Sequence, residues 1–280
     1  MANFDSQSYK VKKDYIEDIK EGGYLPELLD YTIGFLGHSK GKPIDASKLG
    51  NWMKLGTWDC SLKTTQALLV NLYYKSLLHM SSLAKTWWVD CRARLTKVTV
   101  ESWTEKFISP KVIQDTLSAV ANWSIRQEPS DPDAEKLNVI IHTAAGEVTA
   151  SYPIEDTSCA IRISLPRTFP LHQATVSSIS RVALDEKKWQ SWLLITQGVI
   201  AFNNNDVVEG LITFRRNIVG ALKGHTQCAI CYSVVSDNGR LPNKECRTCR
   251  GSFHTTCLLK WFQTSGKSTC PLCRSDFDYV

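Results

Sequence analysis

The sequence has no apolar run near the ~20 residues that a membrane-spanning helix needs. Its first residues carry neither a basic start nor a following apolar stretch, so no secretory signal is visible. Cysteine is scarce over the first 227 residues, where only Cys60, Cys91 and Cys159 occur. A disulfide framework would be expected to staple the whole chain. These absences argue against a membrane protein and against a secreted disulfide-rich protein.

The composition is that of a folded chain, with 43% hydrophobic and 22% charged residues. A chain of 280 residues exceeds the usual size of a domain with a single hydrophobic core, so two or three domains are expected. The formal charge of +5 hints at an anionic partner.

Residues 1–108 have helical patterns. Apolar residues recur at i, i+3 and i+4 spacing from Leu62 to Met80, and Tyr24 to Leu36 forms a shorter helix followed by Gly37. We expect helical hairpins of the HEAT type, at the end of a longer solenoid. Five tryptophans should pack between these helices: Trp52, Trp58, Trp87, Trp88 and Trp103.

Residues 109–223 have an α+β pattern. Ser109 and Pro110 predict a helix start, with Ser109 as N-cap and Pro110 as first helical residue, and the helix should run to about Trp123 or Arg126. After a polar loop at 128–133, alternating residues predict four strands, and two helices follow. We therefore expect one antiparallel sheet with helices covering a face, built from strands at 137–142, 148–153, 160–165 and 174–180 and helices at 185–202 and 206–222.

Residues 224–280 form a cysteine-rich third domain after a short joint at Gly224. Seven of the ten cysteines lie between Cys228 and Cys273, and with one histidine they form four pairs, each separated by two residues. One such pair supplies half of a tetrahedral Zn²⁺ site, so four pairs predict two closed, structural zinc sites. Metal binding should supply folding energy on the order of 10 kcal/mol per site. Ordinary buried thiols are the alternative, which four matched pairs disfavour: Cys228/Cys231, Cys246/Cys249, His254/Cys257 and Cys270/Cys273.

This order of four cysteines, one histidine and three cysteines resembles the RING-CH form of the RING family of ubiquitin ligases. The resemblance implies a cross-brace, in which Cys228, Cys231, His254 and Cys257 hold zinc 1 and Cys246, Cys249, Cys270 and Cys273 hold zinc 2. PHD fingers share the ligand order but usually carry an aromatic residue where this chain has Ser268. A zinc-stabilised binding module without ligase activity, such as a histone reader or a ribosomal scaffold, is the alternative function.

Residues between the ligands also resemble RINGs and imply their roles. Ile230, Trp261, Pro271 and Leu272 would form an apolar groove for a ubiquitin-conjugating enzyme (E2), with Trp261 held outward by a short helix at 258–264. Arg274 would bridge the E2 and its bound ubiquitin, whose thioester a substrate lysine attacks. The protein would supply orientation and no nucleophile. The alternatives place Trp261 in the core of the zinc module and Arg274 as a solvated side chain.

The middle domain resembles an RWD domain around Leu165 to Leu171. RWD domains share the fold of ubiquitin-conjugating enzymes without their chemistry. Cys159 is the one cysteine of residues 109–227 and has no His-Pro-Asn signature nearby, so a docking role is favoured over a second, active conjugating enzyme.

A helical segment, an RWD domain and a C-terminal RING-CH together resemble the C-terminal end of the listerin family, the ubiquitin ligases of ribosome-associated quality control. That resemblance implies a cytosolic, ribosome-associated fragment of a much longer chain. It further implies ubiquitin transfer to stalled nascent polypeptides, with the RWD domain docked on the large (60S) ribosomal subunit near the tunnel exit and no membrane partner.

Two basic stretches without acidic residues suit phosphate-rich RNA, although solvated surface faces explain them equally well. The net charge of the whole chain does not decide between RNA contact and a solvated surface. Seven ligand thiolates add −7 and two Zn²⁺ add +4, which lowers the formal charge of +5 to about +2. The basic residues concerned are Arg162, Arg167, Arg181, Arg215 and Arg216.

Overall fold

The computed structural model describes residues 9–53, 61–127, 137–154, 157–181, 186–222, 226–233, 236 and 242–277. The predicted loop at 128–133, the joint at Gly224 and the side chain of Trp58 lie outside these ranges. Within them, no helix is long and apolar enough to cross a membrane.

The amino-terminal part consists of helices, as the periodicity predicted. Each helix packs its buried side chains against its neighbours. Trp87, Trp88 and Trp103 lie between the helices and are at most 7% exposed. The indole Nε1 of Trp103 donates to the Ile44 carbonyl at 2.7 Å. The helices are α1 (Tyr9–Glu21), α2 (Tyr24–Phe35), α3 (Leu62–His79), α4 (Ser81–Asp90) and α5 (Arg94–Phe107), with short 3-10 turns at His38–Lys40 and Ala46–Leu49.

Helix α6 (Ser109–Ile125) begins one residue before Pro110, the predicted first helical residue, and the predicted capping role of Ser109 is wrong. Ile108 is the N-cap and has helical backbone angles, so the chain passes from α5 into α6 almost without a break. The Ser109 hydroxyl is buried and makes no hydrogen bond within the described part of the chain. Pro110 is tolerated because the first turn of a helix has no partner for its N–H.

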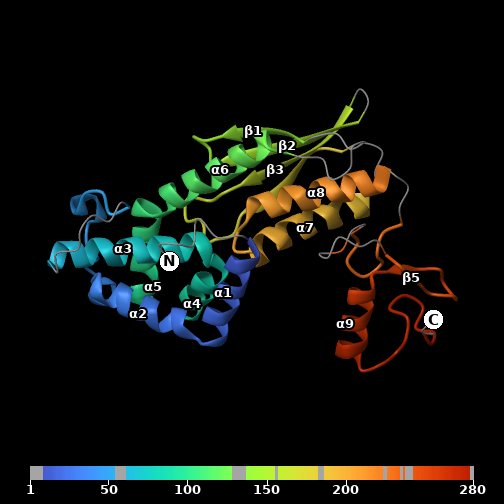
Figure 1. Ribbon diagram of the computed structural model, residues 1–280, viewed down its shortest axis with the longest axis horizontal. Coiled ribbons are helices and arrows are strands. Elements are labelled where there is room, and N and C mark those ends of the chain that lie inside the picture. The colour runs from blue at the N-terminus through green and yellow to red at the C-terminus, as the bar shows by residue number, and fades with distance from the viewer. Residues whose placement is uncertain are drawn as a thin grey trace.

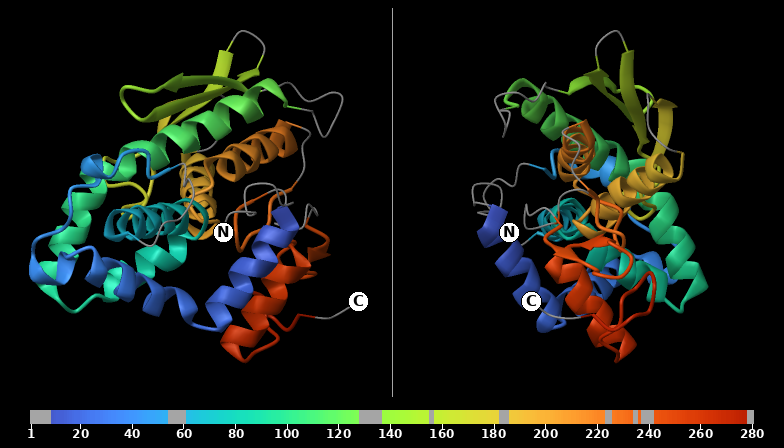
Figure 2. Two further views of the ribbon diagram at one scale, coloured as in Figure 1. Left: turned by 60° about the vertical axis from the view of Figure 1, so that its left-hand side comes forward. Right: turned by 90° about the vertical axis from the view of Figure 1, so that its right-hand side faces the viewer.

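A four-stranded antiparallel sheet follows in the order β1-β2-β3-β4. Val148 and Ala150 of β2 are fully buried while Thr149 between them is half-buried, so one face of the sheet points to the core. Figures 1 and 2 show α6, α7 and α8 gathered on that side. The elements are β1 (Asn138–His142), β2 (Glu147–Ile154), β3 (Thr157–Ser164), β4 (Thr175–Ser180), α7 (Glu186–Phe202) and α8 (Val207–Leu222).

The helical part and the sheet share one continuous core that runs from Leu25 to Ile218. Polar contacts reinforce the joint: Asn204, in the α7–α8 turn, accepts hydrogen bonds from the hydroxyl and the backbone N–H of Ser82 at 2.7 and 3.3 Å. Helix α4 has no side-chain cap of its own, because its N-cap position is Met80. Asn204 therefore caps a helix 122 residues away in sequence.

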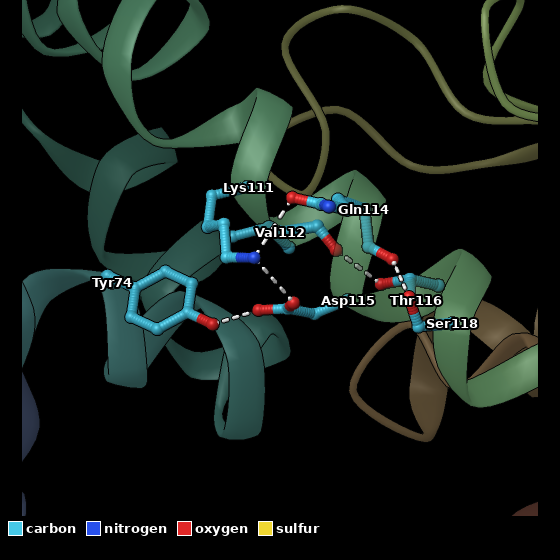
Figure 3. Close-up of polar contacts among 7 residues, drawn as sticks. All are labelled: Tyr74, Lys111, Val112, Gln114, Asp115, Thr116 and Ser118. Atoms are coloured by element: carbon cyan, nitrogen blue, oxygen red, sulfur yellow. Dashed lines mark hydrogen bonds and ion pairs between the residues drawn. The ribbon is translucent and has the colours of Figure 1, made fainter. Parts of the chain in front are cut away.

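A second contact of this joint links α3 to α6 (Figure 3). The Tyr74 hydroxyl donates to the Asp115 carboxylate, whose other oxygen lies 3.1 Å from Lys111 Nζ. Lys111 also donates to Gln114 Oε1 at 2.9 Å. Asp115 is thus fully engaged by its neighbours.

The C-terminal module has a separate, small core around Phe253, Leu258 and Phe277. It contains β5 (Lys244–Glu245), β6 (Ser252–Phe253) and α9 (Thr255–Ser265). The module lies against α7 and α8 on the side away from the sheet (Figures 1 and 2). Two hydrogen bonds hold it there: the fully buried Trp192 indole donates to the Tyr232 carbonyl at 3.2 Å, and the Ser233 hydroxyl donates to Asn217 Oδ1 at 2.7 Å.

Candidate metal centre

Three of the four ligand pairs fold into the same backbone turn. In each, the residue after the second cysteine donates its N–H to the carbonyl of the first cysteine: Tyr232 to Cys228 at 2.8 Å, Arg250 to Cys246 at 2.7 Å and Arg274 to Cys270 at 3.0 Å. Those three donor residues have φ of 56°, 55° and 60°, the left-handed conformation that non-glycine residues rarely adopt. The turn therefore directs both sulfurs of a pair to the same side. We call each of these three turns a knuckle, in chain order the first (Cys228–Cys231), the second (Cys246–Cys249) and the third (Cys270–Cys273).

The fourth pair, His254 and Cys257, lies on the first turn of α9. His254 is the N-cap of that helix and is 2% exposed. A separation of three residues at the start of a helix puts both side chains on one face. The backbone N–H of His254 also donates to Cys228 Sγ at 3.3 Å, which ties this pair to the first knuckle.

The eight side chains gather into two sets, and within each set the ligand atoms lie within 4.8 Å of one another. The sets interleave along the chain, as the RING resemblance implied: Cys228, Cys231, His254 and Cys257 form one, and Cys246, Cys249, Cys270 and Cys273 form the other.

The spacing within each set suits Zn²⁺. A tetrahedral ion with Zn–S bonds of about 2.3 Å places two sulfurs about 3.8 Å apart. Cys246 Sγ and Cys273 Sγ are 3.7 Å apart, and so are Cys249 Sγ and Cys270 Sγ. In the other set, His254 Nδ1 lies 3.3 Å from Cys231 Sγ and 3.8 Å from Cys257 Sγ. Sulfur and imidazole donors are the ligands of structural zinc.

Hydrogen bonds within the ligand sets favour the thiolate form of particular cysteines. A backbone hydrogen bond from Cys249 is the largest cause that lowers the pKa of Cys246 to about 6. A hydrogen bond from the Cys231 thiol lowers the pKa of Cys228 to about 4, helped by backbone donors. The other ligands shift the opposite way, because the hydrogen bond to Cys228 raises the pKa of Cys231 and burial raises the pKa of Cys257 and Cys270. Deprotonation of a whole set therefore depends on the ion.

The proposed conjugating-enzyme groove has contributions from both sets. Ile230 lies in the first knuckle, and Pro271 and Leu272 lie in the knuckle of the last pair. Leu272 is 53% exposed. Trp261 is half-buried on α9, and its indole donates to the Thr269 carbonyl at 3.0 Å, which fixes the orientation of the ring. Arg274 is exposed beside them.

Three of the five basic residues are less available than the linear stretches suggested. Arg215 is only 7% exposed on the inner side of α8, a position that does not suit direct contact with RNA. Arg162 lies 3.7 Å from Glu147 across the sheet, and Arg181 lies 2.5 Å from Glu186 on α7. Arg167 and Arg216 are exposed.

Two features of the site escaped the sequence reasoning. The left-handed conformation of Arg250 and Arg274 follows from their place after the second cysteine of a knuckle, and the repeated spacing was the available signal. The docking of the module through Trp192 and Asn217 has no local signal, because the partners are 40 and 16 residues away.

Comparisons with known proteins agree with this division of the chain. Residues 1–121 match the family described as LTN1 family HEAT repeat region, residues 137–220 match Ubiquitin conjugating domain-like, and residues 226–274 match Ring finger domain. The helical match includes most of α6, which the sequence analysis assigned to the middle domain.

Curated relatives extend over nearly the whole chain. The protein named E3 ubiquitin-protein ligase listerin from Neurospora crassa is 41% identical over 285 residues, covering 99% of this chain. Its counterpart from Schizosaccharomyces pombe is 33% identical over 279 residues, again covering 99%. The Saccharomyces cerevisiae counterpart is 32% identical over 285 residues. The chain spans 17–18% of the length of these relatives.

Metal removal should unfold the C-terminal module alone, because its core is small and separate from the large one. We expect two Zn²⁺ per chain by native mass spectrometry. Stripping them with a chelator should remove hydrogen-exchange protection over 242–277 while residues 61–127 stay protected. Cys246→Ser should act like the chelator, and Cys91→Ser, outside both sets, should change nothing. A module that stays protected without metal would contradict the zinc assignment.

Proposed function

Because the chain belongs to the listerin family, we propose that it carries the ligase end of such a protein, a RING-type E3 ubiquitin-protein ligase. It recruits a ubiquitin-charged E2 and promotes transfer of ubiquitin to lysines of stalled nascent chains on large ribosomal subunits. The observation that carries this proposal is the pair of interleaved Cys/His sets, which bring the exposed Leu272 and the exposed Arg274 into one module with Trp261.

The two zinc ions have a structural role in this proposal. Each set has four protein ligands, which complete a tetrahedron and leave no position for a substrate or a water molecule. The eight residues Cys228, Cys231, His254, Cys257, Cys246, Cys249, Cys270 and Cys273 are the ligands. The ions hold the two halves of the module in register, and the chemistry takes place between the E2 thioester and a substrate lysine.

A second conjugating-enzyme activity in the middle domain is disfavoured by the position of its cysteine. Cys159 is 0% exposed within β3, where neither ubiquitin nor a thioester partner can reach it. A reactive cysteine needs exposure and a setting that stabilises the thiolate. The ubiquitin-conjugating-like fold therefore supports docking rather than catalysis.

The groove of Ile230, Trp261, Pro271 and Leu272 is the proposed E2 contact. An exposed leucine beside a half-buried tryptophan is the composition of a small interface with one aromatic anchor. Because the Trp261 indole is held by the Thr269 carbonyl, little rotamer entropy is lost when the ring is covered.

Arg274 is the proposed bridge between E2 and ubiquitin. A guanidinium has five donors in a fixed fork and can bond carbonyls on two proteins at once. Its left-handed backbone is set by the knuckle, whose N–H···O bond to Cys270 fixes the direction in which the side chain leaves the module. Arg274 holds the charged pair in a reactive arrangement and takes no covalent part.

The middle domain is the proposed ribosome-docking element, through exposed arginines at Arg162, Arg167, Arg181 and Arg216. Arg167 and Arg216 carry most of the proposal, since Arg162 and Arg181 each have a carboxylate partner. The buried contacts of Trp192 and Asn217 with the C-terminal module give the RING a fixed direction relative to this docking element. Such a fixed direction is what positional catalysis requires.

Replacing Trp261 with alanine should leave zinc content and fold unchanged and abolish polyubiquitin formation. Loss of a central aromatic anchor costs about 2 kcal/mol or more, which corresponds to roughly 30-fold weaker E2 binding. Autoubiquitylation across a panel of E2 enzymes provides the measurement. Gln263→Ala, an exposed change on the same helix, is the matched control. Normal ubiquitin chains from the Trp261 variant would refute the groove, and silence of the wild-type chain with every E2 would favour a non-catalytic binding module.

Replacing Arg274 with glycine removes the guanidinium and keeps the backbone turn, because glycine adopts φ near 60° without strain. Discharge of ubiquitin from a charged E2 onto free lysine should slow at least about tenfold while E2 binding is kept, as expected for loss of a bond made only in the reactive arrangement. Arg250→Gly changes the equivalent residue of the neighbouring knuckle, with φ of 55°, and should have no effect. Equal rates for the two variants would exclude the bridging role.

Reversing the charge of Arg167 and Arg216 together, each to glutamate, should weaken co-sedimentation with large ribosomal subunits at low salt. The difference should shrink as salt is raised, because salt screens contacts with phosphate. E2 discharge onto free lysine should be unaffected, so ligase activity and docking are measured independently. Arg126→Glu, an exposed arginine at the end of α6, is the control. Unchanged sedimentation of the double variant would argue against docking through these residues.

A further inference from the structure

The ligand set of zinc 1 is covered by the rest of the chain. None of its four residues is exposed, and Cys228 and His254 are at most 2% exposed. Its first knuckle lies against α7, because the Tyr232 carbonyl accepts a hydrogen bond from the buried Trp192 indole at 3.2 Å. A reagent dissolved in water therefore has restricted access to these ligands.

The ligand set of zinc 2 is open on one side. Cys246 and Cys270, the first cysteines of the second and third knuckles, are at most 2% exposed. Cys249 and Cys273, the second cysteines, are exposed, and of the seven ligand cysteines only these two are. Each knuckle of this set thus presents one sulfur to solvent, and the two exposed sulfurs lie within 4.8 Å of each other.

The two sets also differ in charge. Four thiolates (−4) and Zn²⁺ (+2) give the zinc 2 set a net charge of −2, whereas three thiolates, a neutral imidazole and Zn²⁺ give the zinc 1 set −1. A more negative set leaves more electron density on each sulfur, and it is this density that attacks an oxidant. Exposure and charge therefore single out the same set.

Within the zinc 2 set, Cys249 is the less protected of the two exposed sulfurs. The Ser275 hydroxyl lies 2.9 Å from Cys273 Sγ and 3.7 Å from Cys246 Sγ, so it can donate to a thiolate and withdraw electron density from it. No hydroxyl or amide side chain bonds Cys249 in the described part of the chain. Its sulfur lies 3.7 Å from Cys270 Sγ of the third knuckle, so a second sulfur is close at hand.

We propose that Cys249 is a site of oxidation by hydroperoxides, and that its oxidation releases zinc 2 while zinc 1 stays bound. With hydrogen peroxide, the Cys249 thiolate attacks one oxygen, the O–O bond breaks, and a sulfenic acid forms as hydroxide leaves. A thiolate of the third knuckle then attacks that sulfur, which forms a disulfide and expels a second hydroxide. Each of the two sulfurs gives up one electron and the peroxide takes up both. The set is left with two of its four ligands, too few to retain the ion.

Loss of zinc 2 changes the proposed E2 surface. Leu272 covers Gly251 so closely that a Cβ on Gly251 would lie 2.5 Å from Leu272 Cδ1, and this contact joins the second and third knuckles. A disulfide pulls these knuckles out of the spacing that the ion sets, which displaces Leu272 and Arg274 relative to Ile230 of the first knuckle. This consequence rests on the proposed function, whereas the oxidation of Cys249 does not.

The test uses the full 280-residue chain loaded with two Zn²⁺, and hydrogen peroxide as the oxidant. A chromogenic chelator should detect one equivalent of zinc at least about tenfold faster than the second, because oxidation follows exposure and thiolate character. Mass spectrometry after isotope-coded alkylation should place the first disulfide between Cys249 and the third knuckle, with Cys228, Cys231 and Cys257 still reduced. Release of both ions at one rate, no release, or a first disulfide without Cys249 overturns the proposal.

Matched variants test the order of reactivity. Ser275→Ala removes the hydroxyl beside Cys273 and should speed release of the first zinc about threefold, whereas Ser275→Thr keeps a hydroxyl and should match the wild type. Cys249→His keeps a zinc ligand without the reactive sulfur and should slow release at least about tenfold. Native mass spectrometry checks that each variant binds two ions before oxidation. A wild-type rate in either Ser275→Ala or Cys249→His overturns the assignment.

Ubiquitin discharge, followed in the same samples, separates this proposal from the proposed function. Discharge should fall as the first ion is released and return after a thiol reductant and Zn²⁺ are added. Discharge that persists after release of that ion would contradict the effect on the groove. Absence of discharge before any oxidant is added would count against the proposed function alone, because zinc release and disulfide mapping still decide whether Cys249 is oxidised.

Discussion

The C-terminal module depends on the convergence of ligand atoms from both halves of its sequence. Its apolar core is too small to fix the chain without help. The first set draws its two pairs from either side of Cys246/Cys249, and the second set draws its two pairs from either side of His254/Cys257. Neither half can therefore form a set alone. The proposed E2 surface inherits this dependence, because Ile230 belongs to a knuckle of one set whereas Leu272 and Arg274 belong to a knuckle of the other. The proposed groove would therefore be a product of the interleaving and not of any single loop.

Features governed by short spacing could be predicted from the sequence. The ligand pairs, the α3 helix and the four strands all follow from patterns within a few residues, and the structure has the helix and strands within three residues of the predicted bounds. Predictions failed where a distant neighbour decides the outcome. Ser109 was expected to cap α6, but the preceding helix continues into it and buries the hydroxyl. The basic stretches looked free of acids along the chain, yet sheet pairing and a following helix bring Glu147 and Glu186 to Arg162 and Arg181.

The joints between domains are the least predictable part of the molecule. Asn204 caps a helix 122 residues away, and Asn217 accepts from a serine of the C-terminal module. Asparagine runs in a sequence ordinarily indicate a turn, and this one does form a turn with two left-handed residues. Nothing local shows that the same turn closes onto α4 and forms a wall of a cavity.

A ligase that supplies only orientation gains from every joint that is rigid. The advantage of holding two reactants together is largest when the rotational freedom between them has already been lost. If the middle domain docks as proposed, a flexible connection between it and the RING would lower the effective concentration of E2 at the substrate. Here the helical part and the sheet share one core, and buried hydrogen bonds from α7 and α8 hold the first knuckle of the RING. The direction in which Arg274 and Trp261 face is therefore set by packing that begins at the sheet and passes through these two helices.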